Sequence, residues 1–150
     1  SFLGKIPVLG VCYGAQLMAF QQGGSVEPSR TREYGRARLA SHTVSPLFNG
    51  VSEHSQVWMS HGDTITQVPA HFKLIANTET VNVAAYQIDG QQTYGIQFHP
   101  EVTHSLEGKT LLKNFVADIC GCSQTWTPEA FVESTVQQLK EKLGNDKVVM

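Results

Sequence analysis

The chain has 150 residues, of which 41% are hydrophobic and 16% charged, so it suits one folded domain and is not intrinsically disordered. Its net charge of −2 gives no basic footprint for nucleic acid or an anionic membrane. No apolar run approaches the roughly 20 residues of a membrane span, and no secretory signal opens the chain.

The first elements in chain order are a strand and a helix. Residues 6–11 form a short apolar run, which is typical of a strand buried on both faces in a parallel sheet covered by helices. Residues 15–22 are good helix formers, and Gly23 follows as a stop signal. Cys12 is therefore predicted to lie between a buried strand and the start of a helix.

The middle of the chain has β character. Candidate strands cover residues 36–43, 57–60, 74–78, 84–89 and 93–98, and the Asp89-Gly90 pair between the last two predicts a hairpin. A helix is expected over residues 105–119.

A second C-terminal helix is expected to begin at Thr127, which suits an N-cap, followed by Pro128 at the first helical position. Its apolar stripe consists of Phe131, Val132, Val136, Leu139 and Leu143. The polar stretch 123–127 before it is the one domain boundary that composition suggests. From residue 146 a further apolar run begins, and we expect a strand there whose sequence continues beyond the chain.

The motif around Cys12 has the pattern of a nucleophile elbow, G-x-C-x-G, with Cys as the nucleophile. A turn this tight favours small residues on both sides, at Gly10 and Gly14. It exposes the sulfur at a helix N-terminus, where partial positive charge favours the thiolate. The N–H of Tyr13 would then point to a developing oxyanion. The motif alone is equally compatible with a buried, inert cysteine.

A second motif follows the last predicted strand. His99 and Glu101 are two residues apart, so in extended backbone their side chains point the same way, and Pro100 between them restricts the backbone. The carboxylate would orient the imidazole as a base. By itself the motif could be a surface turn, but Cys12, His99 and Glu101 together supply the nucleophile, base and orienting group that acyl transfer requires.

These two motifs, GVCYGAQ at residues 10–16 and FHPE at residues 98–101, resemble those of the class I (triad) glutamine amidotransferases. The resemblance implies an α/β fold of flavodoxin-like type, with a mostly parallel central sheet flanked by helices. It adds an antiparallel β portion and a C-terminal helix. The strand of residues 6–11 is expected at the centre of the sheet.

The resemblance also implies roles for individual residues. Cys12, His99 and Glu101 would be catalytic, and the backbone N–H of Tyr13 would be an oxyanion donor. Gln16, Ser60 and Gly62 match substrate-binding positions. The family's second oxyanion donor lies upstream of residue 6, in a part that this sequence lacks. The 150 residues alone could therefore be inactive while the complete protein is active.

Within the family, the run VWMSHGD at residues 57–63 and other details resemble the glutaminase domains of GMP synthetases. By this resemblance, residues 1–124 are a glutaminase domain without its N-terminal part, and residues 125–150 are a junction helix and the first strand of a downstream ATP-pyrophosphatase domain, fused or separate. Glutamine would be hydrolysed through a Cys12 thioester, and the ammonia would convert XMP to GMP. No cofactor is expected for the glutaminase domain, whereas ATP and Mg²⁺ are expected downstream. Whether the complete protein forms a homodimer is left open.

The cysteines Cys12, Cys120 and Cys122 are an odd, sparse set, which fits a reducing compartment and a cytoplasmic location rather than a disulfide framework. The single C-x-C is weak evidence for a metal, and no metal site is expected. Two alternatives remain: a Cys-dependent hydrolase or peptidase on a related α/β fold, and a non-catalytic scaffold domain. Neither nucleic acid nor a membrane is expected as a partner.

Overall fold

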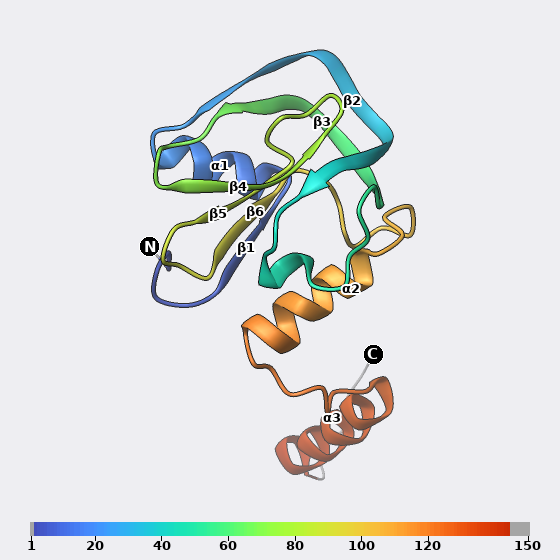
Figure 1. Ribbon diagram of the computed structural model, residues 1–150. Helices are drawn as coiled ribbons and strands as arrows, with labels where there is room; N and C mark the ends of the chain where they lie inside the picture. The colour runs from blue at the N-terminus through green and yellow to red at the C-terminus, as the bar shows by residue number, and fades with distance from the viewer. Residues whose placement is uncertain (1, 145–150) are drawn as a thin grey trace.

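The computed structural model describes residues 2–144, with the side chains of residues 30–33 left out of the description. The strand expected from residue 146 lies outside the described residues. The elements in chain order are β1 (Val8–Val11), α1 (Tyr13–Gln21), β2 (Ser25–His42), η1 (Pro46–Phe48), β3 (Gln56–Gln67), β4 (Phe72–Thr78), β5 (Ala85–Ile88), β6 (Thr93–Ile96), α2 (Gly108–Lys113), η2 (Asn114–Ile119) and α3 (Pro128–Leu143) (Figure 1).

The described strands form one mixed sheet of six strands in the order β1-β6-β5-β4-β2-β3. Strand β1 pairs with β6 in parallel, and the other pairings are antiparallel. The α/β class is confirmed, but the sheet among these residues is not mostly parallel and β1 lies at its edge rather than its centre. The antiparallel pairing has a simple reason: parallel neighbours need a long crossover, usually a helix, whereas β2 to β6 follow one another without an α-helix between them.

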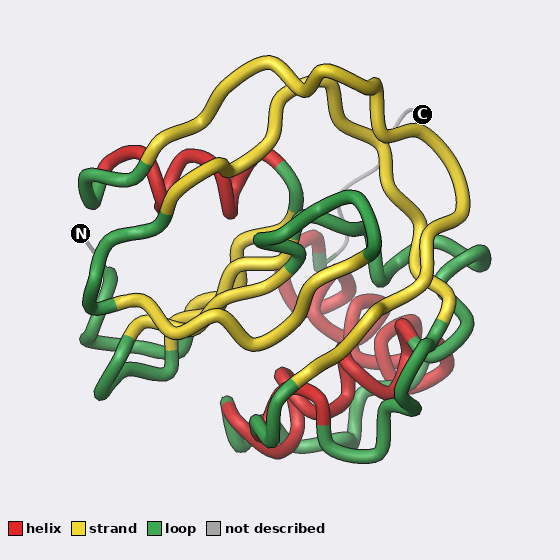
Figure 2. The backbone as a smooth tube through the Cα atoms, turned by 45° about the horizontal axis from the view of Figure 1, so that its top comes forward, coloured by secondary structure: helices red, strands yellow, loops and turns green. Residues whose placement is uncertain are grey.

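Strands β2 and β3 are much longer than the sequence predicts and form an antiparallel ribbon that arches over the rest of the sheet (Figure 2). The end of β2 then leaves this ribbon to pair with β4. The prediction found only residues 36–43 and 57–60 because the outer parts of the ribbon are rich in polar residues. Such segments lack the apolar alternation that marks a half-buried strand.

The side chains of β1 alternate between two apolar cores, one on each face of the sheet. Val8 packs with α1, whose Ala15, Met18 and Ala19 are buried there. The core on the other face contains Leu111 and Ile119 of α2 and η2, and Leu9 and Val11 of β1 pack against it. Helices therefore cover both faces at the β1 edge, as the sequence predicts.

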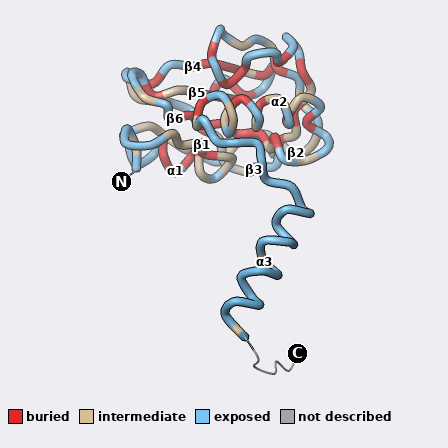
Figure 3. Tube along the Cα trace, turned by 90° about the horizontal axis from the view of Figure 1, so that it is seen from below, coloured by how far each residue is buried: buried red, intermediate tan, exposed pale blue. Residues whose placement is uncertain are grey.

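The helix expected over residues 105–119 begins later, at Gly108, and its second half is the π-helix η2. The other C-terminal helix, α3, begins as predicted: the hydroxyl oxygen of Thr127 accepts a hydrogen bond from the N–H of Ala130 over 3.1 Å. Helix α3 extends away from the body of the chain, and none of its residues is buried (Figure 3). Within residues 2–144, no helix is long and apolar enough to cross a membrane.

Candidate active site

Cys12 occupies a tight turn between β1 and α1, as the motif predicts. Its φ of 50° and ψ of −107° are unusual for a residue with a side chain, and such strain accompanies functional turns. At Gly10 an added Cβ would lie 2.4 Å from Cε of Met18 and 2.8 Å from the backbone carbon of Gly14. At Gly14 an added Cβ would meet no described atom within 4 Å. The prediction that a small residue is required for steric reasons is therefore confirmed at Gly10 and is wrong at Gly14.

The sulfur of Cys12 lies against β3, where its thiol reaches the carbonyl oxygen of Ser60 over 3.8 Å. Burial raises the pKa of this thiol above its ordinary value, and the charge of Glu101 acts in the same direction. The backbone N–H of Tyr13 favours the thiolate and lowers the pKa, but its effect is smaller than that of burial. The Tyr13 N–H at the start of α1 therefore does not outweigh burial, and a base close to the sulfur would assist loss of the thiol proton.

Parallel pairing of β1 with β6 brings the second motif to the same edge of the sheet. Val11 is in register with Ile96, and the N–H of Cys12 donates to the carbonyl of Ile96 over 2.8 Å. The chain continues from β6 directly into His99. Both motifs thus follow the carboxyl ends of neighbouring parallel strands, which is where α/β sheets commonly place their sites.

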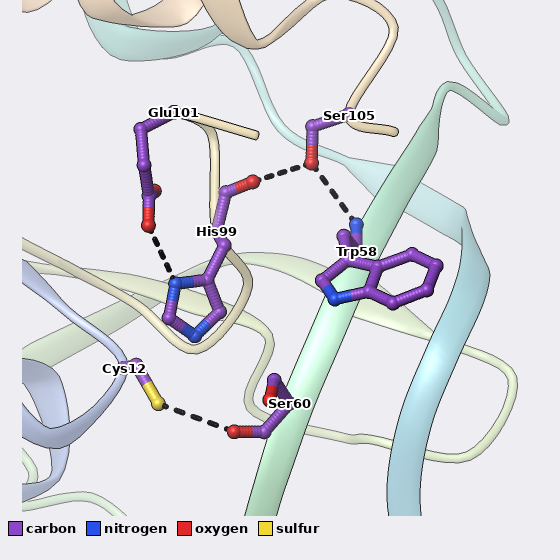
Figure 4. A network of polar contacts seen from close by, with 6 residues as sticks. All are labelled: Cys12, Trp58, Ser60, His99, Glu101 and Ser105. Carbon is purple, nitrogen blue, oxygen red and sulfur yellow. Dashed lines mark hydrogen bonds and ion pairs between the residues drawn. The ribbon is translucent and has the colours of Figure 1, made fainter. Parts of the chain in front are cut away.

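His99 and Glu101 form the pair that their spacing predicts. Nδ1 of His99 and Oε1 of Glu101 are 2.7 Å apart. The imidazole lies between the carboxylate and Cys12, with its other nitrogen turned toward the sulfur (Figure 4). That nitrogen, Nε2, is buried and has no hydrogen-bond partner among the described residues. An imidazole oriented by a carboxylate, with a free nitrogen facing a thiol, can act as a general base.

A serine that the sequence does not single out lies behind His99. The hydroxyl of Ser105 donates to the carbonyl of His99 over 2.5 Å and accepts from the N–H of Trp58 over 3.0 Å. The N–H of His99 in turn donates to the carbonyl of Trp58 over 2.9 Å. Ser105 falls at the predicted start of a helix, where serine is common as a cap. Because a cap already explains this serine, the sequence gives no sign that it contacts the site.

Gln16 is buried in α1, and its amide nitrogen donates to the carbonyl of Asp63 over 2.7 Å and to Oε1 of Gln97 over 3.3 Å. Gln97 is itself buried and donates to the carbonyl of Val83 and the hydroxyl of Thr64. The two amides therefore connect α1 and the end of β6 to β3. Sequence reasoning missed Gln97, although an amide inside the apolar run of residues 94–98 is a signal of a buried polar network.

Ser60 and Gly62 are two residues apart on β3, so they lie on the same face of the strand. Ser60 is exposed, whereas His61 between them is buried and faces the other way. A Cβ at Gly62 would lie 3.9 Å from the hydroxyl of Tyr34, which is an ordinary contact. The structure thus brings Ser60 to Cys12 through its backbone.

Among residues 2–144, no three His, Cys, Asp or Glu side chains gather as metal ligands would. Cys120 and Cys122 are free thiols at the end of η2. Burial raises the pKa of Cys120, with a further contribution from Cys122. These two cysteines follow η2 and are not part of the group around Cys12.

Comparison with known proteins agrees with the geometry of the elbow and the His99–Glu101 pair. The model of the family "Glutamine amidotransferase class-I" matches residues 1–119. The chain belongs to this family.

Two curated relatives and one solved structure show which members of the family this chain is similar to. The "GMP synthase [glutamine-hydrolyzing]" of Cytophaga hutchinsonii is 63% identical over 147 residues, which are 97% of this chain and 29% of that protein. The protein of the same name from Bacteroides fragilis is 60% identical over 148 residues, or 98% of this chain and 29% of the relative. The crystal structure of a "putative gmp synthase subunit a protein" from Thermoplasma acidophilum matches with a TM-score of 0.73 and 30% identity, over 88% of this chain and 61% of its own. The chain thus matches the glutaminase portion of GMP synthases and spans less than a third of the curated relatives.

Proposed function

We propose that this domain hydrolyses glutamine to glutamate and ammonia, with Cys12, His99 and Glu101 as its catalytic residues. The observation that carries the proposal is the position of His99. Nδ1 of His99 is held 2.7 Å from Glu101, and its buried Nε2, unpartnered among the described residues, faces the sulfur of Cys12 (Figure 4). The matched family gives the reaction class.

The reaction would proceed in two halves. In the first, Sγ of Cys12 attacks the side-chain amide carbon of glutamine while Nε2 of His99 accepts the thiol proton. The tetrahedral intermediate collapses when the C–N bond breaks and His99 returns the proton to the leaving ammonia, which leaves a γ-glutamyl thioester. In the second half, His99 takes a proton from water, and the resulting attack releases glutamate and restores the thiol.

The raised pKa of Cys12 fits this sequence of proton transfers. A thiol that is mostly protonated at rest requires a base at the moment of attack, and His99 is that base. The N–H of Tyr13, which favours negative charge at the sulfur, is the proposed oxyanion donor at the start of α1. We assign glutamine binding to Ser60 and Gly62 on the β3 face beside Cys12. Gln16 contributes from α1, where it is bonded to the backbone of Asp63 on the same strand.

For the complete protein we propose the activity that the curated relatives are named for. Residues 1–124 form the glutaminase domain, and residues 125–150 lead into an ATP-pyrophosphatase domain that uses the ammonia to convert XMP to GMP. That domain would require ATP and Mg²⁺, whereas the glutaminase chemistry uses side chains and backbone groups alone. A cytoplasmic location suits both nucleotide substrates and three free thiols.

Helix α3 supports this division of the chain. Its apolar residues Phe131, Val132, Val136 and Leu139 are all exposed, as is Trp126 before it. The stripe covers no part of the glutaminase core, and exposed apolar patches of this kind mark contact with another domain.

The test compares two nitrogen sources in the full polypeptide. Cys12→Ala should abolish GMP formation from glutamine and leave formation from added ammonia unchanged, because ammonia bypasses the thioester. Cys122→Ala serves as the matched control, since it removes an exposed thiol outside the site and should leave both activities intact. Normal glutamine hydrolysis by Cys12→Ala would exclude the proposed mechanism.

A further inference from the structure

We propose that Ser105 is a positioning residue that holds His99 in register with Cys12. The inference rests on the proposed function, because it assigns the role of Ser105 to the base of that reaction. Ser105 does not touch Cys12; it acts through the backbone of His99 and Trp58 (Figure 4).

The three residues form a closed clamp of hydrogen bonds. The N–H of His99 donates to the carbonyl of Trp58 over 2.9 Å. The carbonyl of His99 accepts from the Ser105 hydroxyl over 2.5 Å, and that hydroxyl accepts from the N–H of Trp58 over 3.0 Å. Both backbone groups of His99 therefore end on the same residue of β3, one directly and one through Ser105.

This strand is also the one that contacts the nucleophile. Ser60, two residues after Trp58 on β3, presents its carbonyl to the Cys12 thiol. The proposed base and the proposed nucleophile are thus both hydrogen-bonded to the same short segment of β3. A change that releases His99 from Trp58 alters the distance between Nε2 and Sγ even when β1 and β6 stay paired.

Glu101 alone is poorly suited to hold the ring. Its side chain is 53% exposed, against 23% for His99. An exposed carboxylate can follow a moving imidazole and keep its hydrogen bond, so it sets the orientation of the ring but not its location. Ser105 is only 6% exposed, and its hydroxyl fixes the main chain from which the imidazole projects.

The hydroxyl can be removed without disturbing the local backbone bonds of Ser105. The N–H of Ser105 donates to the carbonyl of Val102 over 3.1 Å, and its carbonyl accepts from the N–H of Gly108 over 3.1 Å. Neither bond uses the side chain. Loss of the hydroxyl leaves a partly buried donor at Trp58 and a partly buried acceptor at His99 unpaired, and the His99 loop must shift to restore them.

The experiment compares Ser105→Thr with Ser105→Val, which have nearly the same shape and differ in the hydroxyl. Alkylation of Cys12 by iodoacetamide is followed by peptide mass spectrometry in the full polypeptide, with Cys122 as an internal reference. We expect Ser105→Thr to stay within about threefold of the parent. Ser105→Val should react about 10- to 100-fold more slowly, since a misplacement near 1 Å can cost about 100-fold.

The same pair is then placed in a His99→Ala background. If Ser105 acts through His99, Thr and Val should alkylate at equal rates there. A merely structural role would slow the Val variant in both backgrounds. Asn114→Ala is the matched structural control, because the buried Asn114 amide also donates to two backbone carbonyls, those of Leu47 and Asn49, away from Cys12. It should lower thermal stability without slowing alkylation of Cys12.

The proposal is overturned if Val and Thr alkylate alike beside native His99, if their difference persists in His99→Ala, or if His99→Ala leaves Cys12 reactivity unchanged. Glutamine hydrolysis by the parent is measured separately. A parent that hydrolyses no glutamine but shows the expected pattern of alkylation would remove the proposed function and leave the role of Ser105 standing.

Discussion

The backbone N–H of Cys12 donates to the carbonyl of Ile96 over 2.8 Å, and this bond extends the parallel pairing of β1 and β6 by one residue. The nucleophile turn is thereby fastened to the strand that leads into His99. Cys12 and His99 are far apart in the sequence, and main-chain hydrogen bonds between β1 and β6 bring their segments together. The backbone of the turn therefore helps to set the geometry of the site.

The first prediction concerns that backbone. Gly10→Ala should destabilise the domain by about 1–3 kcal/mol, because the new methyl group would overlap Met18 and the backbone of α1. The turn must then move, and alkylation of Cys12 should slow as well. Chemical denaturation and the alkylation rate measure the two effects.

Gly14→Ala is the control for this substitution. Gly14 lies in α1, and no described atom within 4 Å would meet its Cβ. Because alanine is the better helix former, the variant should be as stable as the parent or more stable by up to about 1 kcal/mol. Equal destabilisation by the two alanines would contradict the steric account of Gly10.

The second prediction is the pH dependence of Cys12. Burial raises the pKa of its thiol, so at neutral pH less of it is thiolate than in an ordinary cysteine. Its alkylation by iodoacetamide should therefore rise as the pH is raised from 7 to 9, because the thiolate fraction grows over that range. A rate independent of pH between 6 and 8 would show instead that the sulfur rests as a thiolate paired with imidazolium.

The third prediction separates His99 from Glu101. His99→Ala should lower glutamine-dependent turnover about 10²- to 10⁴-fold, the usual contribution of a general base. Glu101→Gln should lose less, because glutamine keeps an oxygen that accepts from Nδ1 of His99. Turnover with added ammonia should be unchanged in both variants.

Glu53→Gln is the control for the third prediction, since Glu53 is an exposed carboxylate in the loop before β3. It should behave like the parent with both nitrogen sources. If Glu101→Gln fell as far as His99→Ala, the carboxylate would do more than orient the ring.

Local chemistry in the sequence was sufficient to predict the elbow, the His99–Glu101 pair and the cap at Thr127. Each depends on a few neighbouring residues, so spacing and residue type carry the information. The sheet order could not be predicted in the same way, because strand pairing joins distant segments. The outer parts of β2 and β3 are rich in polar residues, so no apolar alternation marked the full length of these strands.

The roles of Ser105 and Gln97 were missed for a related reason. Both bond to groups on β3 that are at least 32 residues away in the chain. A hydroxyl or amide that serves a distant backbone group looks the same in sequence as a helix cap or a surface residue. The tertiary fold is needed to tell them apart.

The fourth prediction tests α3. Phe131→Asp combined with Leu139→Asp should leave the thermal stability of the glutaminase domain unchanged, because neither side chain is buried in it. If α3 contacts the downstream domain as proposed, glutamine-driven GMP formation by the full polypeptide should fall, because the charged side chains would disrupt that contact. Alkylation of Cys12 should persist at the parent's rate.

The paired control is Ser134→Asp combined with Gln138→Asp, which adds the same charge at exposed polar positions of the same helix. This variant should retain glutamine-driven synthesis. Unchanged synthesis in the Phe131 and Leu139 variant would show that α3 is not a coupling surface.

The sulfur of Cys12 meets Ser60 and Tyr13 through main-chain groups: the carbonyl of one and the N–H of the other. Every amino acid supplies a carbonyl, and every one except proline supplies an N–H. In a saturation mutagenesis library scored for Cys12 reactivity, position 13 should therefore tolerate most replacements and reject proline. Tolerance at position 13 together with intolerance at Gly10 would show that the reactivity of Cys12 depends more on the backbone conformation around it than on the side chains of neighbouring residues.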